Sequence, residues 1–313
     1  MKHSRNFFHT LWLLLLMPLF LTSCGDDDED PYTDGSSKTE KKANANANPS
    51  SRKEYLRLEF PHIKDDGNNL VVIHTTQEYG VNYAVEWDCD KKSQRWSCYQ
   101  MYDENSVTHT SRYTSTTNQY PQDPDIPAAL RFENDPFWGS GFDHGHICPS
   151  ADRLCSAEAN YQTFFLSNIQ PQFKSFNTGI WEKMEKQVRT WNITKVKKDE
   201  KNYQKFRDTL YVCKGGTIDN ADQVLMTTGK GLLVPRFFFM AILCKNSQGY
   251  KALAFWAEHV NRTSNANDNL YYYTISIDEL EERTGIDFFC NLPDDKEKEV
   301  ERAVNPAAWE LKP

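Results

Sequence analysis

The chain has 313 residues, of which 39% are hydrophobic and 26% are charged, and 36 basic against 44 acidic side chains give a formal net charge of −8 at pH 7. This apolar content excludes a wholly disordered chain. Because the sequence has only one long apolar run, a membrane protein with several spans is also excluded. The acidic balance weakly disfavours nucleic acid as a partner, although the local distribution of charge matters more than the total.

The N-terminus has the order of a secretory signal. Basic residues at positions 2 to 5 precede an apolar run over residues 11–21, which is too short to span a bilayer stably and is followed by small residues. Cys24 follows a Leu-Thr-Ser triplet, an order that resembles a bacterial lipobox, in which the cysteine is acylated after cleavage. We expect a lipoprotein signal peptide over residues 1–23 with Cys24 as the lipidated residue. An ordinary signal peptide with a chance cysteine is the alternative.

The segment after Cys24 is polar. Residues 26–30 are all acidic and resemble the export tag of bacterial surface lipoproteins, and residues 32–51 are rich in Ser, Lys, Asn and Ala. Such a composition cannot offset the entropy lost on ordering, so residues 24–53 are expected to form an acidic, disordered tether. The sequence thus predicts an exported outer-membrane lipoprotein whose folded part begins near Glu54. In such a lipoprotein the folded part can face the cell exterior.

Seven cysteines follow Cys24, and export makes disulfides possible. Seven is an odd number, so at least one thiol is free unless it pairs between chains. Cys89 and Cys98 flank a polar turn between two expected strands, and this pair is the preferred disulfide. Cys148 and Cys155 are interpreted as a disulfide or as buried thiols.

Strands predominate in the expected secondary structure. Alternating or β-rich runs predict strands at residues 55–60, 70–75, 82–87, 96–102, 163–168, 208–214, 237–244 and 250–256. Helical patterns occur at residues 177–191, 277–284 and 296–304. Strands that follow one another without a helix between them favour an antiparallel sheet with helices packed on its faces, which is the α+β class.

Two imidazoles and a carboxylate crowd around one glycine in the segment Asp143-His144-Gly145-His146. Such a cluster suits proton transfer or metal binding, because a neutral imidazole near pH 7 can accept a proton or bind a cation. With Cys148 and Cys155 the two histidines offer four zinc ligands, but this spacing is not a common zinc pattern. A structural zinc site stays an alternative. The other histidines stand singly and are assigned to structure or solvent: His3, His9, His62, His74, His109 and His259.

A second group of polar residues follows further along the chain. Asn168 lies in the run Ser-Asn-Ile-Gln-Pro-Gln, and Asn177 is followed by Trp181 and Glu185 in the predicted helix. The structural interpretation of Asn177, near the start of that helix, is an N-cap. Glu185 lies two helical turns, about 12 Å, further along the axis, so the two side chains can share an ion only through water.

Together these residues resemble the DNA/RNA non-specific endonucleases, the ββα-metal (His-Me finger) nuclease family. The family's Asp-Arg-Gly-His is matched at residues 143–146, its Ser-Asn-x-x-Pro-Gln at 167–172 and its Asn-x-x-x-Trp-x-x-x-Glu at 177–185. The resemblance continues at residues 276–295. It implies one nuclease domain over residues 54–313, with the family's α+β fold and a large, mainly antiparallel sheet. It also implies magnesium-dependent hydrolysis of DNA and RNA to 5′-phosphorylated products.

The resemblance implies roles for individual residues. His146 would be the general base, Asn177 would be the protein ligand of Mg²⁺, for which Mn²⁺ can substitute, and Glu185 would hold water bound to the metal. Arg112, which precedes an Asp-Pro pair as the family's upstream arginine does, would contact the scissile phosphate. Arg131 is the rival for that role, because the intervening loop is long.

Three further residues complete the expected site. Asn168 and Asp143 would brace it, and His144 takes the place of the motif arginine. A guanidinium offers a planar fork of donors that matches phosphate, whereas a neutral imidazole offers one donor. We therefore expect weaker phosphate binding or transition-state stabilisation than in the family pattern, which affects the rate more than the reaction.

The motif region is locally basic. From His144 to Arg207 there are 11 Lys and Arg against 6 Asp and Glu, a local charge of +5. This suits a surface that binds the backbone of DNA or RNA without strong sequence preference and with strong salt dependence. The remaining alternative is a surface-tethered binding protein with a degenerate nuclease site.

Overall fold

The computed structural model describes residues 44–197, 203–262, 268–302 and 304–313. The predicted signal peptide, the predicted lipidation at Cys24 and most of the predicted tether lie outside these residues. Within these ranges, none of the helices combines the length and the apolar character that crossing a bilayer requires.

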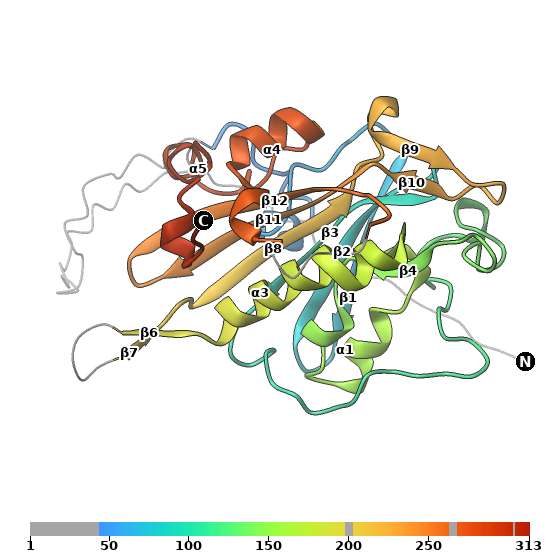
Figure 1. The fold of residues 1–313 in the computed structure, drawn as a ribbon, viewed down its shortest axis with the longest axis horizontal. Coiled ribbons are helices and arrows are strands. Elements are labelled where there is room, and N and C mark those ends of the chain that lie inside the picture. Colours follow the sequence, from blue (N-terminus) through green and yellow to red (C-terminus); the bar gives the residue numbers. More distant parts are fainter. Residues whose placement is uncertain (1–43, 198–202, 263–267, 303) are drawn as a thin grey trace, which may run out of the picture. The chain divides into compact units, whose positions relative to one another are not determined.

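A seven-stranded antiparallel sheet forms the centre of the fold (Figure 1). Its strands, in spatial order, are β1 (Asn69–Thr76), β2 (Gly80–Asp88), β3 (Ser93–Met101), β8 (Thr209–Gly216), β11 (Phe237–Asn246), β12 (Gly249–Glu258) and β13 (Thr274–Ile275). The pairing of β3 with β8 joins strands that are far apart in the sequence. The intervening segment, residues 102–208, leaves the sheet and returns to it, and it carries all three sequence motifs.

Both faces of this sheet are covered. Alternate residues of β11 belong to two separate cores, the even positions 238–244 to one and the odd positions 239–243 to the other. Successive side chains of a strand point to opposite faces, so a strand that is buried on both sides is a continuous apolar run. This explains why the sequence of β11 shows little alternation.

One face is covered by a long helical segment that carries the third motif. It consists of α2 (Lys174–Phe176), the π-helical turn η5 (Asn177–Trp181) and α3 (Glu182–Ile193). Its apolar stripe packs against the even side of β11 through Trp181, Met184, Val188 and Trp191. The other face is covered by α4 (Ile277–Thr284) and α5 (Asp294–Glu301), which contribute Ile277, Leu280 and Val300 to the second core (Figure 1).

The remaining elements are short. Three two-stranded sheets are formed by β4 (Asp143–His146) with β5 (Ile169–Gln172), β6 (Lys195–Lys197) with β7 (Tyr203–Lys205), and β9 (Val224–Thr227) with β10 (Leu233–Pro235). The other helical pieces are α1 (Ala157–Gln162) and the 3₁₀ turns η1 (Lys53–Leu56), η2 (Ala128–Leu130), η3 (Ser150–Asp152), η4 (Leu166–Asn168), η6 (Ala221–Gln223), η7 (Leu270–Tyr273) and η8 (Pro306–Trp309). This arrangement confirms the predicted α+β class with a large antiparallel sheet and helices on its faces.

The strand predicted over residues 55–60 is wrong. Residues 53–56 form η1, and the backbone carbonyls of Tyr55 and Arg57 accept hydrogen bonds from the side chain of Asn291 instead of a neighbouring strand. Phe60 is buried edge-on against Trp96, with the ring centroids 5.8 Å apart. The apolar residues of this run are therefore buried as a turn that packs on the sheet.

The strand predicted over residues 163–168 is also wrong. The side chain of Asn168 donates to the carbonyl oxygens of Thr163 and Cys148, both at 2.8 Å, and so closes residues 163–168 into a tight turn. The strand comes directly after this turn, as β5, over Ile169–Gln172.

Part of the predicted tether is bonded to the folded part. Asn48 is 3% exposed, and its side chain donates to the carbonyl of Pro61 at 2.9 Å and accepts from the amide of Ile63 at 2.8 Å. Asn46 donates to Asp287 and Glu297. The ordered structure thus extends at least to Asn44, on the N-terminal side of the expected start near Glu54.

The predicted disulfide between Cys89 and Cys98 is wrong. The register of β2 and β3 places Cys98 opposite Ala84, and Cys89 lies beyond the end of β2. All seven cysteines in the described part of the chain are free thiols. Cys148 and Cys155 are both buried, so of the two interpretations offered for this pair, buried thiols is the one that the structure supports.

Candidate active site

The first motif forms a short hairpin with the second. β4 pairs antiparallel with β5, with His146 opposite Ile169 and Asp143 opposite Gln172. Gly145 is buried, and a Cβ at this position would overlap the side chain of Gln172. The glycine between the two histidines therefore leaves room for the buried side chain of Gln172.

The third motif lies on the helical segment that packs beside this hairpin. Its helix is interrupted at Gly179, which has φ −110° and ψ −112°, and the surrounding turn is π-helical. Such turns recur at functional sites because they reorient side chains within a helix. The indole nitrogen of Trp181 donates to the backbone carbonyl of His146 at 3.3 Å. The side-chain amide of Asn177 donates through Nδ2 to Oδ2 of Asp143, also at 3.3 Å. Two hydrogen bonds thus join the helix to β4.

These elements enclose one cleft of about 590 Å³. Six of the seven residues predicted for the site line it: Arg112, Asp143, His144, His146, Asn177 and Glu185. The seventh, Asn168, lies behind the cleft. Its side chain accepts from the amide of Cys148 at 2.8 Å and donates to the carbonyls described above, so it fixes the turn that follows β4.

His146 has the electronic state of a proton acceptor. Burial, reinforced by the positive charge of Arg112, lowers the pKa of His146 from 6.5 to about 3, so the ring is neutral at pH 7. Its Nε2 is buried and has no hydrogen-bond partner in the part of the chain that the structure describes. The ring packs edge-on against Phe164, with centroids 4.8 Å apart. A neutral imidazole with a free nitrogen can take a proton from a bound water.

His144, the residue in the place of the motif arginine, is held in an aromatic stack. Its ring stacks on Tyr120 and Phe137, at centroid distances of 3.8 and 4.4 Å and with 4° and 26° between the ring planes. Its Nε2 lies 2.9 Å from a carboxylate oxygen of Asp135. Both the stack and the carboxylate fix the orientation of the imidazole, so this side chain forms an ordered wall of the cleft.

Glu185 has a buried partner that the sequence did not reveal. Burial raises the pKa of Glu185, and the ammonium of Lys214, 2.7 Å from Oε1, opposes this rise. Lys214 is 1% exposed and also lies over the ring of Trp181, 4.6 Å from its centroid. Removing either charge would leave the other buried without compensation, which is strongly unfavourable.

Two arginines line the cleft. Arg112 is exposed, and its guanidinium lies 4.7 Å from the centroid of Phe164. Arg189 donates to Oδ1 of Asp152 at 2.8 Å. Arg131, the rival of Arg112, does not line the cleft, because its guanidinium donates to the backbone carbonyl of Asp123.

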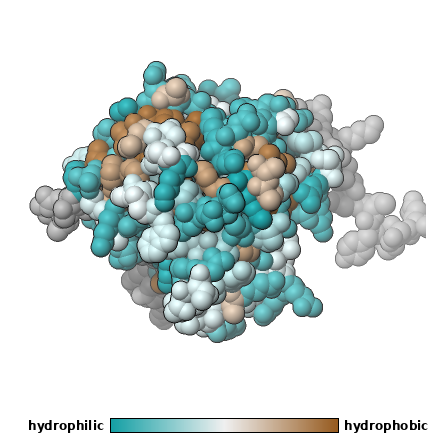
Figure 2. Space-filling view, turned by 90° about the vertical axis from the view of Figure 1, so that its right-hand side faces the viewer, coloured by the Kyte–Doolittle hydropathy of each residue, from teal (hydrophilic) through white to brown (hydrophobic). Residues whose placement is uncertain are grey.

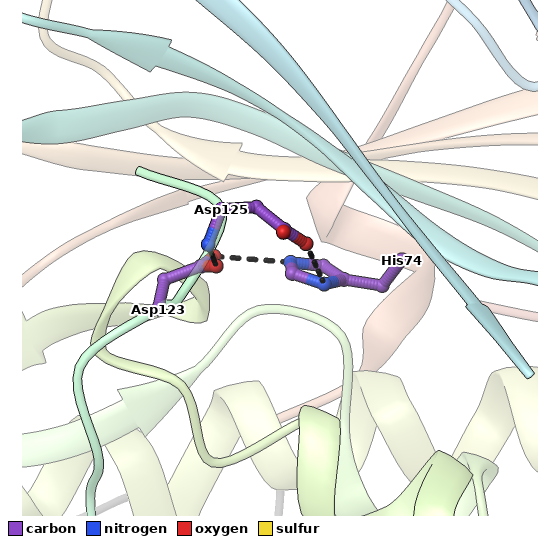
Figure 3. A group of neighbouring side chains, drawn as sticks. All are labelled: His74, Asp123 and Asp125. Carbon is purple, nitrogen blue, oxygen red and sulfur yellow. Dashed lines mark hydrogen bonds and ion pairs between the residues drawn. The ribbon is translucent and has the colours of Figure 1, made fainter. Parts of the chain in front are cut away.

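The segment that carries Tyr120 is tied to the sheet by His74, a residue assigned to structure from the sequence. Figure 3 shows the imidazole of His74 between two carboxylates, with Nε2 3.0 Å from Asp123 and Nδ1 3.7 Å from Asp125. Asp123 also accepts from the hydroxyl of Ser167 in the second motif. The hydrogen bond between Nε2 and Asp123 therefore links β1 to the loops around the cleft.

The residues around the cleft fit a partly hydrated magnesium ion better than a zinc ion. Because Asn177 donates to Asp143 through Nδ2, its Oδ1 is left as a neutral oxygen ligand, the type that Mg²⁺ accepts. Among the described residues, potential metal-binding groups of three or more His, Cys, Asp or Glu occur at His74, Asp123 and Asp125 and at Asp278, Glu281 and Glu301. The proposed zinc ligands His144, His146, Cys148 and Cys155 do not form such a group.

Several residues of the cleft were not found from the sequence. Arg189 follows Glu182 and Glu185 at helical spacing on the side of α3 that lines the cleft, and this spacing could have indicated it. Lys214 is the one charged residue in the apolar run of β8, which is also a usable signal. Tyr120, Asp135 and Phe137 come from loops, and no periodic pattern connects them with His144.

Comparison with known proteins agrees with this geometry. The sequence profile described as "DNA/RNA non-specific endonuclease" matches residues 67–295. The mitochondrial nuclease EXOG of Xenopus laevis is 28% identical over 225 residues, covering 69% of this chain and 59% of that protein. A nuclease of Nostoc sp. is 26% identical over 230 residues, covering 71% of this chain and 76% of that protein. The matched part of the EXOG nuclease is thus less than two thirds of its length, whereas that of the Nostoc nuclease is about three quarters.

A solved structure shares the fold. A chain in the crystal structure of the EndoG/EndoGI complex superposes with a TM-score of 0.56 at 19% sequence identity, covering 72% of this chain and 88% of that chain. The sequence profile covers most of the chain, from β1 to the start of α5, including all three motifs. This chain belongs to the DNA/RNA non-specific endonuclease family.

Proposed function

We propose that this chain is an exported, membrane-anchored, magnesium-dependent endonuclease that hydrolyses the phosphodiester bonds of DNA and RNA to 5′-phosphorylated products. Family membership supports the reaction class. The observation that carries the proposal for this chain is that His146, Asn177, Glu185 and Arg112, which are distant in sequence, line one cleft. Hydrolysis of a phosphodiester needs a base, a neutralised phosphate and a stabilised leaving oxygen, and this cleft offers groups for each requirement.

His146 is proposed as the general base. The proton of the attacking water would pass to Nε2, the buried nitrogen that no described residue engages. The carbonyl of His146 is bonded to Trp181 and its ring is packed on Phe164, so neither the backbone nor the ring needs to reorganise during the transfer. Fixed geometry of this kind is a large part of the rate gain in general base catalysis.

Arg112 is proposed as the phosphate contact. Its guanidinium can present a fork of donors to two phosphate oxygens while its flat face stays on Phe164. His144 would add one donor at most, because Asp135 already engages its Nε2. Arg189 also lines the cleft, where its guanidinium is paired with Asp152.

Asn177 is proposed to hold Mg²⁺ through Oδ1, with Asp143 fixing the amide. When bound, the metal would neutralise charge on the phosphate and on the leaving oxygen. Glu185 would accept hydrogen bonds from water around the ion, and the ammonium of Lys214 opposes the effect of burial on the pKa of this carboxyl. Mn²⁺ has similar preferences for oxygen ligands and is expected to substitute.

Recognition is proposed to depend on the nucleic-acid backbone. The surface seen from the right-hand side of Figure 1 is largely hydrophilic, with its hydrophobic residues gathered near the top of Figure 2. Phosphate contacts from arginines and lysines carry no direct base information. Weak sequence preference and a steep loss of affinity with salt therefore follow.

The cellular location rests on the N-terminal sequence. Residues 1–23 are proposed to be a lipoprotein signal peptide, Cys24 the acylated residue and the following polar residues the tether of an outer-membrane lipoprotein. Metabolic labelling with a radioactive fatty acid tests this directly. The full chain should incorporate label and a Cys24→Ala variant should not; equal labelling of both would contradict the anchor.

The reaction is tested by incubating the chain without its leader with supercoiled plasmid and with RNA, in Mg²⁺ and in excess chelator. We expect fragments of both substrates with 5′-phosphate ends in Mg²⁺ and intact substrates in chelator. Retention of nucleic acid without shortening would instead indicate a binding protein. Cleavage that persists in chelator would contradict the role of the metal.

A further inference from the structure

A second group of acidic side chains lies away from the cleft, where α4 and α5 pack together on the sheet. These helices contribute to the core on the odd side of β11, whereas the helical segment that carries Asn177 and Glu185 covers the even side. The group consists of Asp278 and Glu281 on α4 and Glu301 on α5. It belongs to none of the three sequence motifs.

The three carboxylates converge. Asp278 and Glu281 are one helical turn apart and so project from the same side of α4. One carboxylate oxygen from each of them and one from Glu301 all lie within 4.8 Å of one another. Like charges at this distance repel strongly in a partly buried setting, so the arrangement is unfavourable unless the carboxylates take up protons or a cation lies between them.

Glu301 shows most clearly that a partner is required. Glu301 is 7% exposed, and its Oε1 is buried without a hydrogen-bond donor among the described residues. A buried polar atom without a partner is costly and rare. Glu281 accepts the amide of Phe288 on Oε1 at 2.7 Å, which leaves Oε2 for another contact.

The surrounding groups do not neutralise this charge. In the described ranges, no lysine, arginine or histidine forms an ion pair with Asp278, Glu281 or Glu301. The nearby Asp287 and Glu297 add more negative charge, and both accept from the amide of Asn46, a neutral donor.

A hard divalent cation fits this donor set. Three carboxylates supply up to six oxygens, and Ca²⁺ takes six to eight oxygen ligands with flexible geometry and bidentate carboxylates. Mg²⁺ demands a near-octahedral shell and usually keeps several waters, which suits three partly buried, convergent carboxylates less well. Soft ligands are lacking here, which disfavours zinc.

We propose that Asp278, Glu281 and Glu301 form a calcium site that joins α4 to α5. The bound ion would compensate the buried charge of Glu301 and fix the C-terminal helix to the sheet. The role is structural and does not depend on the proposed nuclease activity.

The test is the melting temperature of the full chain, freed of metal with chelator and then titrated with CaCl₂ in the absence of Mg²⁺. Binding to the folded state raises the Tm by mass action, so Ca²⁺ should raise the Tm of the wild type by a few degrees. Glu301→Gln removes one charge from the cluster and should fold at least as stably as the wild type without Ca²⁺. The rise in Tm on adding Ca²⁺, the Ca²⁺ increment, should be lost in this variant. Glu299→Gln on the same helix, whose exposed carboxylate pairs with Lys296, is the matched control and should keep it.

A second variant separates this site from the cleft. Asn177→Ala should keep the full Ca²⁺ increment, and Glu281→Gln should lose most of it. Isothermal titration of the metal-free wild type with CaCl₂ should show one site that is absent in Glu301→Gln. The proposal is overturned if Ca²⁺ leaves the wild-type Tm unchanged, if Glu301→Gln keeps the increment, or if Asn177→Ala loses it.

Discussion

The imidazole of His144 lies flat against the phenol ring of Tyr120, with centroids 3.8 Å apart and ring planes 4° from parallel. Phe137 covers the other side of the imidazole, and Asp135 engages its Nε2. The position of the motif arginine is therefore a flat slot with a carboxylate at its end. A guanidinium is also planar, stacks on aromatic rings and pairs with carboxylates.

The slot predicts that His144→Arg is tolerated and active. The guanidinium should stack between Tyr120 and Phe137, keep the contact with Asp135 and add donors for phosphate. We expect kcat/KM for plasmid cleavage to equal or exceed that of the wild type, by up to about tenfold. His144→Leu fills the slot without a donor and should cleave more slowly than the wild type. An arginine variant slower than the leucine variant would show that the slot does not serve phosphate binding.

We expect Lys214 to affect the cleavage rate through Glu185, although Lys214 does not line the cleft. Lys214→Met removes the ammonium that opposes the effect of burial on Glu185, so the pKa of Glu185 should rise further and a larger fraction of the carboxyl should be protonated. Loss of such an outer partner typically lowers activity by about 10- to 100-fold. Cleavage should recover as the pH rises, because Glu185 ionises again.

The control for Lys214 is Lys186→Met, which removes an exposed lysine from α3 and should change little. If both lysine variants lose the same activity, the effect is one of general charge. If the loss in Lys214→Met does not depend on pH, Glu185 is not the group through which Lys214 acts.

Arg112 and Arg131 can be separated by salt dependence. Arg112→Ala should weaken nucleic-acid binding and reduce the slope of log K against log salt by about 1, as expected for one lost phosphate contact. Arg131→Ala should leave the slope unchanged, because its guanidinium donates to the carbonyl of Asp123. Filter binding at several salt concentrations, in chelator to prevent cleavage, measures both. The opposite pattern would reassign the phosphate contact to Arg131.

The burial of His146 also predicts a pH effect on stability. Its pKa is about 3 in the folded state and about 6.5 when exposed, so protonation favours the unfolded chain. Its contribution to the free energy of unfolding is therefore complete above pH 6.5 and decreases as the pH falls toward 3. Relative to the wild type, His146→Gln should gain up to about 1.4 kcal/mol per pH unit below pH 6.5.

Urea unfolding of both proteins at pH 7, 6 and 5 measures this difference, in which contributions from other titrating groups cancel. A constant difference over this range would show that His146 titrates normally in the folded protein.

The predictable parts of the fold are those with local signals. α4 spans Ile277–Thr284 as predicted, because Ser276 caps its first turn and Gly285, with φ +67°, ends it in the left-handed region. Six of the seven strands of the central sheet are alternating or β-rich runs long enough to recognise, whereas β13, with two residues, was not predicted. The wrong strand over residues 163–168 shows the limit: its apolar residues are buried by a turn that Asn168 closes, and nothing local signals that contact.

The candidate site divides in the same way. Residues within the motifs could be found because the family pattern places them, and the structure brings five of the predicted ones to one cleft together with Arg112. Tyr120, Phe137 and Asp135 could not be found, because their contacts with His144 depend on how two loops pack. The disulfide prediction failed for a similar reason. The register of β2 and β3 places Cys98 opposite Ala84, and the length of the turn alone does not determine which residues face each other.

The most direct test of the account is single-turnover cleavage of supercoiled plasmid in Mg²⁺ by His146→Ala, beside His62→Ala as an exposed histidine outside the cleft. Both variants should have wild-type circular dichroism spectra. Loss of a general base lowers the rate by roughly 10²- to 10⁴-fold, so His146→Ala should cleave at least about a hundred times more slowly than the wild type, and His62→Ala should cleave normally. Cleavage by His146→Ala at the wild-type rate would contradict the assignment of His146 as the base.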